Sequence, residues 1–248
     1  MSALVVPLLL GTVACGAGSG GGEERAGGAE KASGAPQREE GRAAVLKAME
    51  LTGEDIGPRR EIRVLDNGLA AGYGKSDSAA DPARCRPLDL MVSYSSSPEP
   101  KAFHPYAVVE KGTTYDKPKG DELVVGLAAH DEAGAKKVMA GLRDAVAKCG
   151  KGFESAEGTY GEVRDWPAQG IGDEAVAYVL QGGTHGEFAA ARFTVVRSGS
   201  TVITFRATDL EAPSELTGPD LKLVDAQVEK AEKVAKEKAE KVAKEKAE

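Results

Sequence analysis

Hydrophobic positions recur at helical spacing in two parts of the chain. Within residues 40–51 these positions are Val45, Leu46 and Met49, and Thr52-Gly53 follows the run. Within residues 131–149 they are Val138, Leu142, Ala145, Val146 and Cys149. Spacings of three and four residues place such side chains on one face of a helix. Two helices are therefore predicted, the second with Asp131 as N-cap and Gly150 as the stop after its last turn.

Apolar and polar residues alternate in other segments, as they do in strands with one buried face. Predicted strands cover 61–65, 106–111 and 122–128, and a meander of three strands follows within 175–208. Residues 85–94 alternate over too short a stretch to decide between strand and helix. The order helix, strands, helix, strands predicts an α+β fold, an antiparallel β-sheet packed against helices on one side.

Large hydrophobic residues are scarce at both ends of the chain. Residues 16–43 are mostly Gly, Ala, Ser, Glu and Arg, and residues 226–248 are nearly all Ala, Glu, Lys and Val. Such segments bury too little apolar surface to form a core. We therefore assign one domain to residues 44–226. A disordered, flexible linker at 15–43 precedes it, and a charged helical tail at 227–248 follows it.

The apolar run that opens the chain ends at a cysteine. Residues 3–13 are too short to cross a bilayer as a helix, which needs ~20 residues, but they suit a signal peptide. The next residues, Ala14-Cys15, resemble the lipobox of bacterial lipoproteins, although Thr12 stands where Leu is usual and no Lys or Arg precedes the run. We predict a lipoprotein signal peptide at 1–14, with fatty acyl chains such as palmitate on Cys15. A buried strand and an ordinary signal peptide are the alternatives.

Two cysteines remain if Cys15 carries lipid, and they are Cys85 and Cys149. An exported domain lies in an oxidising compartment, where such a pair forms a disulfide. The helical phase of Cys149 directs it toward the core, which favours a structural bond over a reactive thiol. Two buried free thiols are the alternative. A zinc site is disfavoured, because neither cysteine belongs to a C-x-x-C pair and no His lies at ligand spacing.

Catalytic motifs are missing from the sequence. The serines at 93–97 lack the G-x-S-x-G frame of a nucleophile elbow, and His104, His130 and His185 lie far apart in the chain. We interpret the adjacent acids Asp173-Glu174 as a turn cap rather than an acid-base pair. These features predict a protein that is not an enzyme and has no cofactor and no metal site.

Charge separates this chain from nucleic-acid binders. Its net charge is -7, and no Lys/Arg-rich block interrupts the mixture of signs. The tail repeats AEKVAKEK at 231–238 and 239–246. Eight residues turn an α-helix by about 800°, so equivalent valines drift by about 80° per repeat and form no continuous apolar stripe. A coiled coil is thus disfavoured, and the tail is predicted to be a solvated spacer or, alternatively, a partner-binding helix.

Five segments follow one another in a familiar order and spacing. They are LTGEDIG at 51–57, Cys85, AKCG at 147–150, IGDEA at 171–175 and FTVVRSGSTVITF at 193–205. Together they resemble the extracellular sensor domain of mycobacterial PknH-type serine/threonine kinases and of the small actinobacterial lipoproteins that share it. The resemblance implies a cleft open to solvent that binds an unidentified extracellular signal. Those kinase domains carry two disulfides, whereas this domain can form only one.

These observations predict a membrane-anchored extracytoplasmic lipoprotein that acts as a ligand-binding or sensing module. Lipid on Cys15 would hold it at the outer face of the cell membrane. Its partner would be an unidentified small ligand, a cell-wall fragment or a protein, and not nucleic acid. The alternative is a structural or scaffold lipoprotein that recruits a partner through its charged C-terminal helix.

Overall fold

The computed structural model describes residues 34–65, 79–114, 116–156, 158–168, 170–183 and 189–246. Cys15, the predicted signal peptide and the linker up to residue 33 lie outside these ranges, as does His185. The chain divides into a unit at 1–35 and a unit at 36–248, and the second unit holds every strand described below.

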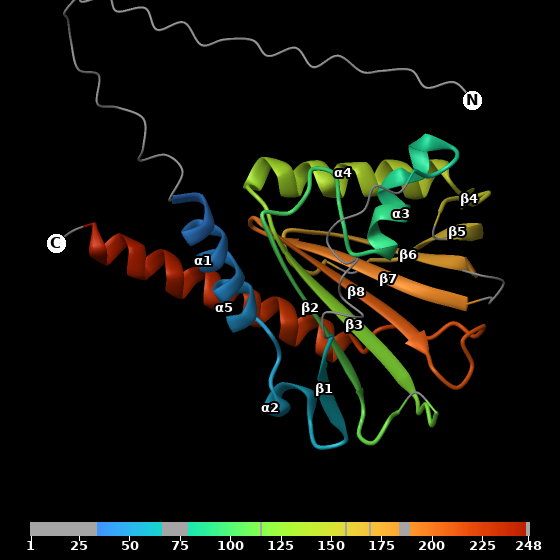
Figure 1. Cartoon of the computed structure of the whole chain (residues 1–248), viewed down its shortest axis with the longest axis horizontal. Helices are drawn as coiled ribbons and strands as arrows, with labels where there is room; N and C mark the ends of the chain where they lie inside the picture. The colour runs from blue at the N-terminus through green and yellow to red at the C-terminus, as the bar shows by residue number, and fades with distance from the viewer. Residues whose placement is uncertain are drawn as a thin grey trace, which may run out of the picture. The chain divides into compact units, whose positions relative to one another are not determined.

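One antiparallel sheet of eight strands forms the centre of the described part of the chain (Figure 1). Its strands are β1 Arg60–Val64, β2 Ala102–Glu110, β3 Asp121–Ala129, β4 Phe153–Glu154, β5 Thr159–Trp166, β6 Glu174–Gly183, β7 Ala189–Ser198 and β8 Thr201–Asp209. Their order across the sheet is β1-β2-β3-β8-β7-β6-β5-β4, so β3 and β8 are the only neighbours that are not consecutive among these strands. This sheet confirms the predicted α+β class.

Five helices accompany the sheet in the described residues. They are α1 Gly34–Ala48, α2 Gly53–Ile56, α3 Arg86–Val92, α4 Glu132–Lys148 and α5 Leu221–Glu245, and a short 3-10 turn at Ala83–Cys85 leads into α3. The segment at 85–94 is therefore a helix rather than a strand. Its Pro87 lies in the first turn, where a missing backbone N–H breaks no helical hydrogen bond.

Helices cover both faces of the sheet, so the prediction that they lie on one side was wrong (Figure 1). Residues of α3 and α4 share one core cluster with Val195 and Val202. Residues of α1 and α5 share a second cluster with Val196 and Ile203. Neighbouring residues of a strand point to opposite faces, so β7 and β8 bury apolar side chains on both sides.

Strand β5 is not among the predicted strands. Only two of its side chains, Tyr160 and Val163, are buried. A register shift between Tyr160 and Glu162 interrupts its pairing with β6. Two apolar positions and an irregular register give too weak an alternation to identify this strand from the sequence.

Helix α5 begins at Leu221, six residues before the predicted start of the tail at 227. Its first turns pack into the core through Leu223, Val224, Gln227, Val228 and Ala231, whereas most later side chains are exposed. None of the helices in the described ranges has the length and apolar content needed to cross a membrane.

Candidate functional site

Cys85 and Cys149 form a disulfide whose Cα atoms are 5.9 Å apart. Cys85 precedes α3 and Cys149 is the C-cap residue of α4, so the bond joins the two helices on one face of the sheet. Both cysteines are buried in the cluster beneath these helices. The bond is therefore part of the scaffold and lies in the core rather than at a surface site.

The adjacent acids Asp173 and Glu174 bind arginines. Arg197 donates through Nη1 to Asp173 Oδ2 at 2.6 Å and through Nε to Glu174 Oε1 at 2.5 Å. Arg143 of α4 also pairs with Glu174, and the backbone N–H of Gly199 donates to Asp173 at 2.8 Å. The contacts of Arg197 and Gly199 with Asp173 hold the turn between β7 and β8, whereas Glu174 binds two arginine side chains.

The two described histidines lie in separate environments. His104 Nε2 lies 2.5 Å from Glu50 Oε2, and His130 Nε2 lies 3.5 Å from the Ser96 hydroxyl. That hydroxyl donates to the Pro98 carbonyl at 2.8 Å, so its proton is not directed at His130. Burial lowers the pKa of His130. Among the described residues, no three His, Cys, Asp or Glu side chains gather where they could hold a metal ion.

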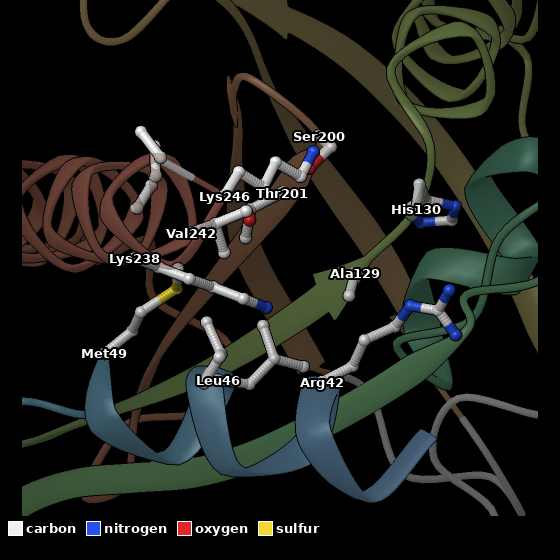
Figure 2. A pocket seen from close by; sticks show the side chains of 14 residues that line it. Arg42, Leu46, Met49, Ala129, His130, Ser200, Thr201, Lys238, Val242 and Lys246 are labelled. Carbon is white, nitrogen blue, oxygen red and sulfur yellow. The ribbon is translucent and has the colours of Figure 1, made fainter. Parts of the chain in front are cut away.

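A pocket of about 630 Å³ lies between α1 and α5, on the side of the sheet that these helices cover (Figure 2). Its lining residues are Arg42, Val45, Leu46, Met49, Ala129, His130, Ser200, Thr201, Ala235, Lys238, Ala239, Val242, Ala243 and Lys246. Pockets that bind small molecules are usually about 300–1,000 Å³ and mostly apolar. The cavity between α1 and α5 has both properties, and we call it the α1–α5 pocket.

The floor of the α1–α5 pocket is one end of the strand pair β3–β8. Ala129 of β3 faces Thr201 of β8 in the register of the sheet. Just beyond them, the backbone N–H of His130 donates to the Ser200 carbonyl at 2.9 Å. This hydrogen bond joins the end of β3 to the β7–β8 turn, so the floor lies where β3 ends and β8 begins.

A buried polar network holds the two walls together. Gln227 of α5 accepts a hydrogen bond from the Tyr106 hydroxyl and donates through Nε2 to the Met49 carbonyl at 2.9 Å. Burial raises the pKa of Tyr106, which keeps its proton available for this bond. Farther along, Lys230 of α5 binds Asp55 at 2.7 Å. Gln227 thus ties α5 to the residue that follows α1, and Lys230 ties it to α2, both through side chains that do not line the pocket.

Positive charge surrounds the apolar lining. Arg42, Lys238 and Lys246 line the pocket, and no Asp or Glu does. Within the part of the chain that the structure describes, none of these three cations takes part in an ion pair. Figure 2 shows the Lys238 side chain extending from α5 across the pocket. A cationic site in a chain of net charge -7 is a local departure from the composition.

The sequence did not identify this pocket, although one signal was present. The eight-residue repeat suggested that α5 has no continuous apolar stripe beyond its start. In the structure an apolar stripe does run along this helix. Ala231, Ala235 and Ala239 continue it from Val228 to Val242. Counting alanine as apolar at spacings of three and four would have identified this face.

The fold and the site define a class: an α+β domain with helices on both faces of an antiparallel sheet and an apolar, cation-lined pocket. No family model matches the chain, and neither does any curated protein. Among solved structures it is similar to the extracellular domain of PknH from Mycobacterium tuberculosis, with 13% identity and a TM-score of 0.43 over 78% of this chain and 96% of that one. It is also similar to an uncharacterised Mycobacterium smegmatis protein, the Rv0999 ortholog, with 15% identity and a TM-score of 0.42 over 77% and 96%. The domain named by the sequence resemblance is thus among these structures, and at such identities the likeness concerns the fold.

Proposed function

We propose that this protein is an extracytoplasmic ligand-binding module, tethered to a membrane by lipid on Cys15. The observation that carries the proposal is the α1–α5 pocket, an apolar cavity of about 630 Å³ built on the central strands. The buried Cys85–Cys149 disulfide supports a location outside the reducing cytoplasm. Lipid anchoring rests on the lipobox-like residues Ala14-Cys15.

The scaffold alternative assigns α5 to an external partner. One face of α5, from Ala235 to Lys246, already lines the pocket, which favours a role for this helix in ligand binding. Truncation before α5 would therefore remove a wall of the site together with the tail. A single substitution inside the pocket distinguishes the two functions better than truncation does.

The neutral apolar dye Nile red tests the pocket. The full chain carrying Cys15→Ala, which has no acyl chain of its own, is expected to bind the dye and shift its fluorescence to shorter wavelength. Ala239→Trp fills the cavity from an exposed position of α5 and is expected to abolish that shift. Glu240→Trp is the matched control, because this neighbour does not line the pocket. Equal dye binding by both tryptophan variants would contradict the proposal.

The tether has its own test, which is the mass of the mature amino terminus. We expect a chain cleaved before Cys15, with acyl chains on that residue, in the membrane fraction of the native host. Cys15→Ala should leave the protein unprocessed or released from the membrane. A wild-type amino terminus without any acyl mass would show that the protein is not lipid-anchored.

A further inference from the structure

We infer that the α1–α5 pocket binds a single-chain anionic amphiphile, a molecule with one acyl chain and a carboxylate or phosphate head. The inference rests on the proposed function and names the ligand class of the same site. Two properties of the lining support it separately, one for each end of such a molecule.

The apolar part of the lining suits a hydrocarbon chain. Leu46 of α1 and Met49, the residue after α1, line the pocket on one side, and Ala239 and Val242 of α5 line it on the other. Leu46 and Met49 are almost fully buried in the core, so they form a fixed surface, whereas Val242 is 40% exposed. An acyl chain of the ligand that lies between the helices would remove both its methylene groups and the Val242 side chain from water.

The cations suit an anionic head. Arg42 comes from α1, Lys238 comes from α5 and Lys246 is the C-cap residue of α5, so cations line both walls of the pocket. Guanidinium and ammonium groups form charge-assisted hydrogen bonds to carboxylate and phosphate oxygens. The hydroxyls of Ser200 and Thr201 supply neutral donors on the floor. Because the lining contains no carboxylate, the site would repel a cationic head and hold an anionic one.

Lys238 and Lys246 line the pocket, whereas the other lysines of the repeated segment do not. Lys236 and Lys244 belong to the same helix and are exposed, but they do not line the pocket. Lys238 of α5 and Lys246, the C-cap residue of α5, are also exposed but line the cavity. The helix therefore offers a comparison in which charge is removed equally, inside or outside the proposed head-group site.

Calorimetric titration of the Cys15→Ala chain tests the inference with twelve-carbon probes below their micelle-forming concentration. Dodecanoate and dodecyl phosphate are expected to bind at least about tenfold more tightly than dodecyltrimethylammonium, and the tighter of the two anions identifies the preferred head. Lys238→Met with Lys246→Met should weaken both anions at least about tenfold. Lys236→Met with Lys244→Met, the matched control, should leave their affinities unchanged.

The other outcomes separate the two proposals. If the anionic and cationic probes bind equally and only Ala239→Trp abolishes their binding, the charge inference is overturned while the pocket remains a ligand site. If no probe and no Nile red binds, the proposed function fails as well. If no probe binds but Lys238→Met with Lys246→Met abolishes adsorption to phosphatidylglycerol vesicles, the cations form a membrane-surface patch and the inference is wrong.

Discussion

Replacing Cys85 and Cys149 together by alanine is expected to lower the free energy of unfolding by about 4 kcal/mol. The disulfide closes a loop with a sequence separation of 64 residues, and a loop of this length removes about 4 kcal/mol of chain entropy from the unfolded state. For a single domain of ordinary stability, about 5–15 kcal/mol, that is a large fraction. Urea denaturation, monitored by circular dichroism, measures the change.

The double substitution avoids leaving one unpaired thiol in the core. Reduction of the wild-type disulfide should move its urea midpoint toward that of the double variant, and the reductant should leave the double variant unchanged. An identical midpoint for oxidised wild type and double variant would show that the bond contributes nothing to stability.

Gln227→Ala is expected to destabilise the protein by about 3 kcal/mol. Gln227 is fully buried and bonds to both Tyr106 and the Met49 carbonyl. The substitution leaves a cavity and deprives two buried polar groups of a partner, and each effect alone costs about 1–3 kcal/mol. Because the network joins α5 to the end of α1, the variant should also bind Nile red more weakly. Denaturation and dye titration measure the two effects.

Glu229→Ala is the matched control, since Glu229 is exposed on the same turn of α5. Its effect should stay within about 0.5 kcal/mol, as for most surface substitutions. If Gln227→Ala proves equally mild, α5 is not held by the buried network, and the pocket wall depends on apolar packing alone.

Periodicity predicted the elements that bury a well-defined face. The helix at 131–149 is α4, with Asp131 accepting from the Gly134 N–H at 2.7 Å as its N-cap, although Cys149 rather than Gly150 is its C-cap residue. The strands predicted at 61–65 and 122–128 agree with β1 and β3 to within one residue at each end. Each of these segments carries its own repeating pattern, so no distant contact is needed to identify it.

Tertiary arrangement was predicted less well, because it depends on which faces meet. Val195-Val196 and Val202-Ile203 each place one side chain on either face of the sheet, and a pair of adjacent valines does not reveal that two layers of helix cover them. The Cys85–Cys149 disulfide could be predicted from the sequence, since two cysteines allow only one bond. The pocket could not be predicted, because Arg42 and Lys238 line one cavity only once both helices lie on the sheet.

The walls of the α1–α5 pocket come from the first and last helices of the described chain, so the pocket can form only after the last helix has been delivered. A polypeptide that crosses a membrane amino end first delivers α1 and all the strands before α5. Until Val224 and Val228 are in place, the apolar face of β7 and β8 beneath α5 remains exposed to water and open to mispairing. During that interval a chaperone would have an apolar surface to bind, and the α1–α5 pocket would still lack one wall.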